Sequence, residues 1–321
     1  MVLSPDGDLY YFKQSIKKYP YEFWSEIIAY EIGKMLGFDV LQYDIAIDGE
    51  KIGCVCKSMI NPEAQELVEG GKYLSSFDNT FVYEDKKPAE RYNYELIDAT
   101  FQAFHLKDKE KLIETFVFDA IISNGDRHQE NWGFIIEHGY VSKAISELEL
   151  EFKWNNLEQI PKWLKKWVKD FYFQKGKKDL KLPMLKAKLT INSNHKFSPI
   201  YDSGSSLGRE LTDEKVEKML KDSVQFEAFL NRGKSEIHWD TKKIGHFEFV
   251  ENLKTKDSQT VTKILDRVKQ KFNAKELRRI LNSIDAEVPE TFINNRIPKE
   301  RKELILKLVT SRIERLYRGK K

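Results

Sequence analysis

The sequence predicts an α+β fold in two unequal parts, a small mixed β/α N-terminal lobe and a large, mostly helical C-terminal lobe. Alternating apolar and polar residues, typical of strands, are frequent in residues 1–60. From Ala89 to the end, by contrast, segments with apolar residues at helical spacing follow one another. The stretch between them, residues 61–88, is polar and contains the Gly70-Gly71 break, so we expect it to be the hinge and interlobe connection.

The N-terminal part predicts a strand, a helix and a hairpin, in that order. The segment Asp8–Ser15, DLYYFKQS, predicts an aromatic strand that carries Lys13, and Phe23–Phe38 has the spacing of an amphipathic helix. The alternating run QYDIAIDGEKIGCVCKSM predicts a hairpin around the Asp48-Gly49 turn. Its two cysteines, Cys54 and Cys56, would face the same side of a strand, too close for an easy bridge. We therefore expect small core residues rather than a disulfide or a zinc site.

The C-terminal part, residues 89–321, predicts a series of helices. Helical spacing covers Tyr92–Phe104, Asp108–Ser123, Thr212–Ser223, Asp257–Phe272, Ala274–Ile284 and Lys299–Tyr317, with N-terminal signals at Thr212, Ser258 and Pro298. A basic and aromatic insertion occupies about residues 140–197. Within it, Ile160–Phe173 predicts an amphipathic helix, and packing on the large lobe is favoured over a tRNA- or phosphate-contacting surface.

Composition points to a cytoplasmic protein. The 321 residues with 40% apolar content are enough for a sizeable core. No apolar run approaches the roughly 18 residues that span a bilayer, and no secretory signal is visible. The formal net charge of +3 is too small to indicate nucleic acid as a direct ligand.

The segment Ile121–Ile136, IISNGDRHQENWGFII, carries Asp126, Arg127, His128 and Asn131 between two apolar runs. In phosphoryl-transfer enzymes, an Asp followed five residues later by an Asn places a carboxylate at the acceptor hydroxyl and a carboxamide on a metal ion. The same composition also forms ordinary turns. A second carboxylate favours the catalytic interpretation, because Asp202 follows a short β-type run within SPIYDSGSSL.

Two N-terminal residues complete this set. A strand lysine that contacts nucleotide phosphates, oriented by a helix glutamate, is the ion pair that kinases use for alignment. Lys13 and Glu26 fit these roles, and Glu31 is the second glutamate of the same helix. Taken singly, each residue is better explained structurally, Lys13 as an edge-strand cation and Glu26 as a first-turn acid favoured by the helix dipole.

The order Lys13, Glu26, Asp126, Asn131, Asp202 strongly resembles the HipA-like serine/threonine kinases. The cell-translocating kinase group looks closest in the DRHxxNWGF string. The resemblance covers most of the chain and includes MLGFDV, CVCKSMI as the hinge, PIYDSGSSL and a helical tail that ends near Arg312. It implies a two-lobed protein-kinase-like fold that uses ATP and Mg²⁺ to phosphorylate a serine or threonine of a protein, with autophosphorylation left open.

The resemblance also implies a role for each site residue. Lys13 would bind the α- and β-phosphates and pair with Glu26, Asp126 would be the catalytic base, and Asn131 and Asp202 would bind magnesium. Lys57, Met59 and His128 are further nucleotide-binding candidates. The preference for Glu26 over Glu31 rests on its place just before the apolar run that leads to the Leu-Gly turn.

One part of the family pattern is missing. HipA-like kinases resemble other kinases in having a flexible Gly- or Ser-rich loop upstream of the strand that carries the lysine. The short segment before Lys13 offers only the tight Asp6-Gly7 turn, which would join two strands. Three explanations stay open: a start assigned too late, a partner protein that supplies the missing lobe, or a weakened or inactive kinase.

Alternative functions follow from the same motifs. GDRHxxN is also close to the catalytic string of phosphoinositide kinases, and GDxxxxN to that of antibiotic phosphotransferases, which would make the acceptor a lipid or a small molecule. A pseudokinase, or a toxin-like subunit that needs a small antitoxin or N-lobe partner, is the non-catalytic alternative. The serines Ser203, Ser205 and Ser206 are candidates for phosphorylation, although a turn chosen for its backbone geometry is favoured.

Overall fold

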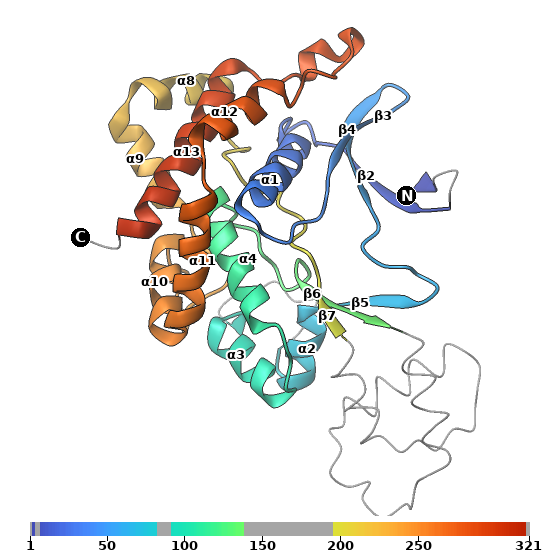
Figure 1. Ribbon diagram of the computed structural model, residues 1–321, viewed down its shortest axis with the longest axis vertical. Helices are drawn as coiled ribbons and strands as arrows, with labels where there is room; N and C mark the ends of the chain where they lie inside the picture. Colours follow the sequence, from blue (N-terminus) through green and yellow to red (C-terminus); the bar gives the residue numbers. More distant parts are fainter. Residues whose placement is uncertain (1, 4–6, 82–90, 138–194, 319–321) are drawn as a thin grey trace, which may run out of the picture.

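The protein is described by a computed structural model that covers residues 2–3, 7–81, 91–137 and 195–318 (Figure 1). Its first sheet has four antiparallel strands in the order β1-β2-β4-β3. Their bounds are β1 Val2–Leu3, β2 Leu9–Lys13, β3 Asp44–Asp48 and β4 Lys51–Lys57. The β3–β4 pair is the hairpin expected from the sequence, and Gly49 in its turn has a φ of 59°.

Strand β4 lies inside the sheet, between β2 and β3. Cys54, opposite Lys13, is fully buried, and Cys56 faces the same side; both are free thiols, as predicted. The segment CVCKSMI was expected to be the hinge, but its residues up to Lys57 belong to β4, so the connection begins only at Ser58. Backbone hydrogen bonds to two neighbouring strands explain why this segment is part of the sheet.

Helix α1, Glu22–Leu36, packs against β4 on one side and against α11 and α12 on the other. Trp24, Ile28 and Ile32 are fully buried within it, because both sides of the helix are covered. The helix ends at Gly37, whose φ of 77° is a left-handed conformation that favours glycine. Figure 1 shows α1 between the sheet and the C-terminal helices.

The polar stretch that was expected to be a connection contains two elements. Strand β5, Gln65–Glu69, joins β6, Gly133–Glu137, and β7, His195–Phe197, in a second antiparallel sheet of order β5-β6-β7. Helix α2, Gly70–Phe77, follows directly. A Cβ on Gly70 would lie 2.2 Å from the Trp132 ring, so this glycine marks a close approach at the start of a helix.

The C-terminal part is helical. Its elements are α3 Tyr94–Ala103, α4 Lys109–Ile122, α8 Asp213–Lys221, α9 Ser223–Arg232, α10 His246–Lys256, α11 Ser258–Lys271, α12 Ala274–Ser283, the 3₁₀ helix η3 Glu290–Asn295 and α13 Lys299–Arg318. Helix α4 is central, since it contacts α10, α11 and α13, and every residue from Leu112 to Ile122 is buried. It leads directly into the Asp126 segment.

Most predicted helices are present, with two differences. Helices α9 and α10 were not predicted. The segment predicted as one helix over Thr212–Ser223 ends at Lys221, because Asp222 caps α9 by accepting hydrogen bonds from the backbone N–H groups of Val224 and Gln225. The basic and aromatic insertion, including Ile160–Phe173, lies outside the described residues except at β7. Within the described ranges, no helix is long and apolar enough to cross a membrane.

Candidate functional site

Lys13 joins three segments of the chain through its ammonium group. Nζ donates hydrogen bonds to Glu26 Oε1 at 2.6 Å and to Asp202 Oδ1 at 2.8 Å. Lys13 ends β2, Glu26 lies in α1, and Asp202 follows β7. Glu31, the alternative partner in the sequence, lies instead beside Lys34. We refer to Lys13, Glu26 and Asp202 as the lysine cluster.

Glu26 is the buried member of the lysine cluster. Its side chain has 0% exposure, and its second oxygen, Oε2, accepts a hydrogen bond from the backbone N–H of Ser203 at 2.8 Å. Burial raises the pKa of the Glu26 carboxyl, while Lys13 opposes that shift. An unpaired carboxylate would be costly in such a place, so Glu26 depends on Lys13 and on the Ser203 backbone.

Asp202 faces solvent more than its partners. Its side chain is 43% exposed and its φ is 53°, a left-handed conformation that aspartate tolerates better than most residues. Burial favours its protonated form, but Lys13 outweighs burial and lowers the pKa of Asp202. Burial would also lower the pKa of Lys13, yet Glu26 and Asp202 raise it above its ordinary value. The cluster therefore carries two carboxylates around one cation.

Asp126 lies in the segment after α4 and has a partner on each carboxylate oxygen. His128 Nε2 is 2.5 Å from Oδ1, and Ser205 Oγ donates to Oδ2 at 2.8 Å. The hydrogen bond from His128, followed by that from Ser205, lowers the pKa of Asp126 well below its usual range, although burial opposes the shift. The carboxylate is therefore ionised at neutral pH and can accept a proton.

Asn131 lies close to Asp126 in space as well as in sequence. Its Nδ2 donates to the carbonyl oxygen of Asp126 at 2.9 Å, and its backbone N–H donates to the carbonyl of His128 at 3.0 Å. Because the amide nitrogen is bound to the loop, the amide oxygen is the atom able to ligate a cation.

Arg127 is a structural residue of the site whose role the sequence left open. It is fully buried, and its guanidinium donates to both oxygens of Asp119, with Nε and Nη2 at 2.9 and 2.8 Å. Nη1 donates to the carbonyls of Asn131 at 2.8 Å and Tyr201 at 2.6 Å. Arg127 thus ties α4 to the Asp126 segment and to the residue before Asp202. Asp119 was the signal, since a carboxylate within an apolar helix requires a partner.

Two predicted nucleotide-binding residues lie apart from the cluster. The ammonium of Lys57 is half exposed and lies 2.6 Å from Asp8 Oδ2, and Met59 lies in the connection after β4. Neither residue is joined to the lysine cluster by a hydrogen bond or ion pair in the part of the chain that the structure describes. Their assignment to nucleotide binding stays a prediction.

A cavity of about 330 Å³ opens beside Asp126. Its lining includes Tyr19, Asp126, Ser205, Arg209, Phe229 and Arg232. It places the carboxylate of Asp126 next to a space large enough for a side chain. We call it the Asp126 cavity.

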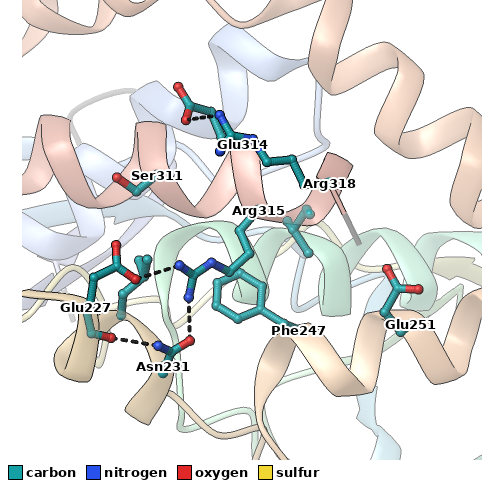
Figure 2. Close-up of a pocket in the computed structure, with 10 residues that line it drawn as sticks. Glu227, Asn231, Phe247, Glu251, Ser311, Glu314, Arg315 and Arg318 are labelled. Carbon is teal, nitrogen blue, oxygen red and sulfur yellow. Dashed lines mark hydrogen bonds and ion pairs between the residues drawn. The ribbon is translucent and has the colours of Figure 1, made fainter. Parts of the chain in front are cut away.

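A second cavity, of about 440 Å³, lies between α9, α10 and α13 (Figure 2). Figure 2 shows the guanidinium of Arg315 between Glu227 and Asn231, to which it donates hydrogen bonds, near the Phe247 ring. None of the lysine-cluster residues lines this cavity. It is a separate feature of the helical part.

The donor chemistry of the site fits magnesium. Mg²⁺ prefers oxygen ligands and is held by one or two carboxylates together with substrate phosphates and water. Asp202 offers a carboxylate and Asn131 an amide oxygen. In the described segments, no group of three or more His, Cys, Asp or Glu residues could hold a metal ion.

Comparison with solved structures shows which known proteins have a similar fold. The chain is similar to the Helicobacter pylori proinflammatory kinase CtkA, with a TM-score of 0.65 and 18% identity over 96% of this chain and 85% of that chain. The fold is kinase-like. A weaker similarity, with a TM-score of 0.44 and 10% identity over 97% of this chain and 58% of the other, is to HipA in the Shewanella oneidensis MR-1 HipA–HipB–operator DNA complex.

The resemblance to HipA-like kinases that the sequence predicts is confirmed as a similarity of fold. No protein-family model and no curated protein sequence matches the chain.

Proposed function

We propose that this protein is a magnesium-dependent serine/threonine kinase of HipA-like type that transfers the γ-phosphoryl group of ATP to a protein hydroxyl. The observation that carries the proposal is the lysine cluster, with Asp126 and Asn131 on the adjoining loop. Phosphoryl transfer requires groups that position the nucleotide and the acceptor and that neutralise the charge of the phosphates, and these residues are of the types that do so. The nucleotide would bind between a small N-terminal lobe and the helical lobe.

Lys13 would bind the α- and β-phosphates. Its side chain is 34% exposed, so an anion can reach the ammonium while Glu26 holds it from the buried side. Asp202 and Asn131 would hold Mg²⁺, which when bound neutralises part of the phosphate charge. Because Asp202 already contacts Lys13, both would face the same phosphates.

Asp126 would accept the proton of the acceptor hydroxyl. As the hydroxyl oxygen bonds to the γ-phosphorus, the bond from that phosphorus to the β,γ-bridging oxygen breaks and ADP leaves. The hydrogen bonds from His128 and Ser205 keep Asp126 ionised, so its carboxylate would orient the acceptor hydroxyl and receive the proton as transfer proceeds. Arg127 holds the loop in place from its buried side.

Calorimetric titration with a non-hydrolysable ATP analogue, with and without Mg²⁺, tests the nucleotide site. We expect magnesium-dependent binding that Asp202→Asn removes, whereas Asp266→Asn, an exposed carboxylate on α11, binds as the parent protein does. In a phosphotransfer assay, Asp126→Asn should lose about 10²- to 10⁴-fold in rate, the usual contribution of a general base. Full transfer activity in either site variant would refute the assignment.

The class of acceptor is tested separately. Mass spectrometry of phosphorylated products distinguishes a protein serine or threonine from a small molecule or a lipid. A partner protein, such as an antitoxin or a chain that supplies an N-terminal loop, stays a prediction from the sequence.

A further inference from the structure

The hydroxyl of Ser205 lies where an acceptor hydroxyl would be expected. Its Oγ donates a hydrogen bond to Asp126 Oδ2 at 2.8 Å. A general base must lie within about 2.6–3.2 Å of the group whose proton it takes. Ser205 meets that distance within the same chain, without any substrate.

The residue before Ser205 lies against the lysine cluster. A Cβ on Gly204 would be 3.1 Å from Lys13 Nζ and 2.9 Å from Glu26 Oε1. The backbone therefore passes from the groups proposed to bind phosphate to the proposed base within one residue. The γ-phosphoryl group would lie between those two points, next to the Ser205 hydroxyl.

The three serines after Asp202 differ in their surroundings. Ser203 and Ser206 are buried, with 5% and 0% exposure, and Ser203 uses its backbone N–H to hold Glu26. Ser205 is partly exposed and, unlike the other two, lines the Asp126 cavity. Ser205 is therefore the serine of this turn that is placed for modification.

The Asp126 cavity contains two arginines beside the carboxylates of Asp126 and Glu210. Arg209 and Arg232 line it together with Ser205. Arg209 pairs with Glu22 at 3.0 Å and is close enough to Asp126 to favour its charged form. A phosphoserine carries nearly two negative charges, which Asp126 would repel and arginines would bind through charge-assisted hydrogen bonds.

We propose that Ser205 is the protein's own phosphoryl acceptor, modified within the same chain, and that Arg209 and Arg232 then hold its phosphate. Ser205 Oγ bonds to the γ-phosphorus of ATP, its proton passes to Asp126, and the bond to the β,γ-bridging oxygen breaks to release ADP. This inference rests on the proposed kinase function. It names the first acceptor of that site.

The test uses the full-length protein, treated with phosphatase, purified and then incubated with magnesium and ATP. Tandem mass spectrometry of the unmutated chain should locate one phosphoryl group on Ser205, and Ser205→Thr should carry it on the new threonine. Ser205→Ala should show none at this position. Ser258→Ala, an exposed serine at the start of α11, is the matched control and should be phosphorylated on Ser205 like the parent.

Transfer within one chain has a kinetic signature. The fraction of chains modified per unit time should not depend on protein concentration. A size-tagged Asp126→Asn chain mixed with the parent should also stay unmodified at Ser205. Phosphate on that tagged chain would overturn transfer within the same chain.

Phosphorylation of casein in the same reactions separates this inference from the proposed function. Casein phosphorylation with no phosphate on Ser205 would overturn the inference and leave the kinase assignment standing. That result, together with slower casein phosphorylation by Ser205→Ala, would make Ser205 a residue that only orients Asp126. If casein and Ser205 both stay unmodified and no magnesium-dependent nucleotide binding is seen, both proposals fail.

Discussion

Gly204 lies against both charges of the Lys13–Glu26 ion pair. Its position permits the turn after Asp202 to approach the pair so closely that an added carbon would lie within 3.1 Å of both side chains. Real Cβ atoms rarely approach neighbours this closely, so a side chain here must displace Glu26 or Lys13. Glu26 has little freedom to move, because it is buried and bound to the Ser203 backbone.

We expect Gly204→Ala to weaken binding of the magnesium–ATP analogue at least about tenfold, which corresponds to about 1.4 kcal/mol. The physical reason is the displacement of the ammonium that would bind the phosphates. Gly245→Ala is the matched control, because the nearest atom to its added carbon is the Gly233 carbonyl oxygen at 3.7 Å. Calorimetric titration of both variants measures their affinity for the magnesium–ATP analogue. Equal affinity in the two would contradict this account of Gly204.

Helix α4 and the loop that follows it form one unit through Arg127. The guanidinium makes two hydrogen bonds to α4 and two to backbone carbonyls of separate loops. A lysine has a compact ammonium that cannot reproduce this fork. The position of the proposed base therefore depends on a buried cation that has no direct role in the proposed transfer step.

Arg127→Lys should lower the free energy of unfolding by about 1–3 kcal/mol, because the ammonium keeps the positive charge but leaves buried acceptors of the Arg127 guanidinium without a donor. Arg279→Lys is a matched control, because Arg279 also makes two hydrogen bonds to one carboxylate, Glu276, but is exposed on α12. Its change should stay within about 0.5 kcal/mol. Urea unfolding of both variants measures the loss in the free energy of unfolding. Similar losses in the two would show that the burial of Arg127 does not determine its contribution to stability.

Elements with a strong periodic pattern of apolar residues could be predicted from the sequence, because such a pattern depends only on the residues of the segment itself. Helix α1 and the β3–β4 hairpin belong to this group. Helix α9 was missed because it begins at Ser223, separated from α8 by Asp222 alone, so the two helices have no loop between them. Helix α10, which starts with the aromatic run HFEF, was not predicted either.

The candidate site was predictable as a set of residue types in order, but its geometry was not. The Lys13–Glu26 and Lys13–Asp202 contacts join residues 13 and 189 positions apart. The support that Arg127 receives from Asp119 and Tyr201, 8 and 74 positions away, also depends on tertiary packing. Motif spacing contains no information about such contacts.

On the scale of the whole molecule, the proposed nucleotide site is formed by residues from two separate parts of the fold. Lys13 and Glu26 come from the first sheet and α1, whereas Asp126 and Asp202 come from segments beside the helical part (Figure 1). A ligand that contacts both groups binds the folded chain and not the unfolded one. Its binding energy must therefore stabilise the entire structure.

The melting temperature should rise when magnesium and the ATP analogue are added. At a ligand concentration about 100 times Kd, the stabilisation should be about 2.7 kcal/mol. Asp202→Asn should show little or no shift at the same concentrations, and Asp266→Asn should match the parent. Differential scanning calorimetry measures all three; a full shift in Asp202→Asn would mean that the ligand binds elsewhere.

Arg312 of α13 connects the last helix to the end of α4, just before the Asp126 segment. It is completely buried, and its guanidinium donates to the carbonyls of Ala120, in the last turn of α4, and Leu230. Burial lowers its pKa to about 9, yet it remains charged near neutrality. Ala120 and Arg312 are 192 positions apart, so during translation the Asp126 loop leaves the ribosome long before its support is made. The segment that carries the proposed base therefore lacks this support until α13 has been synthesised and docked.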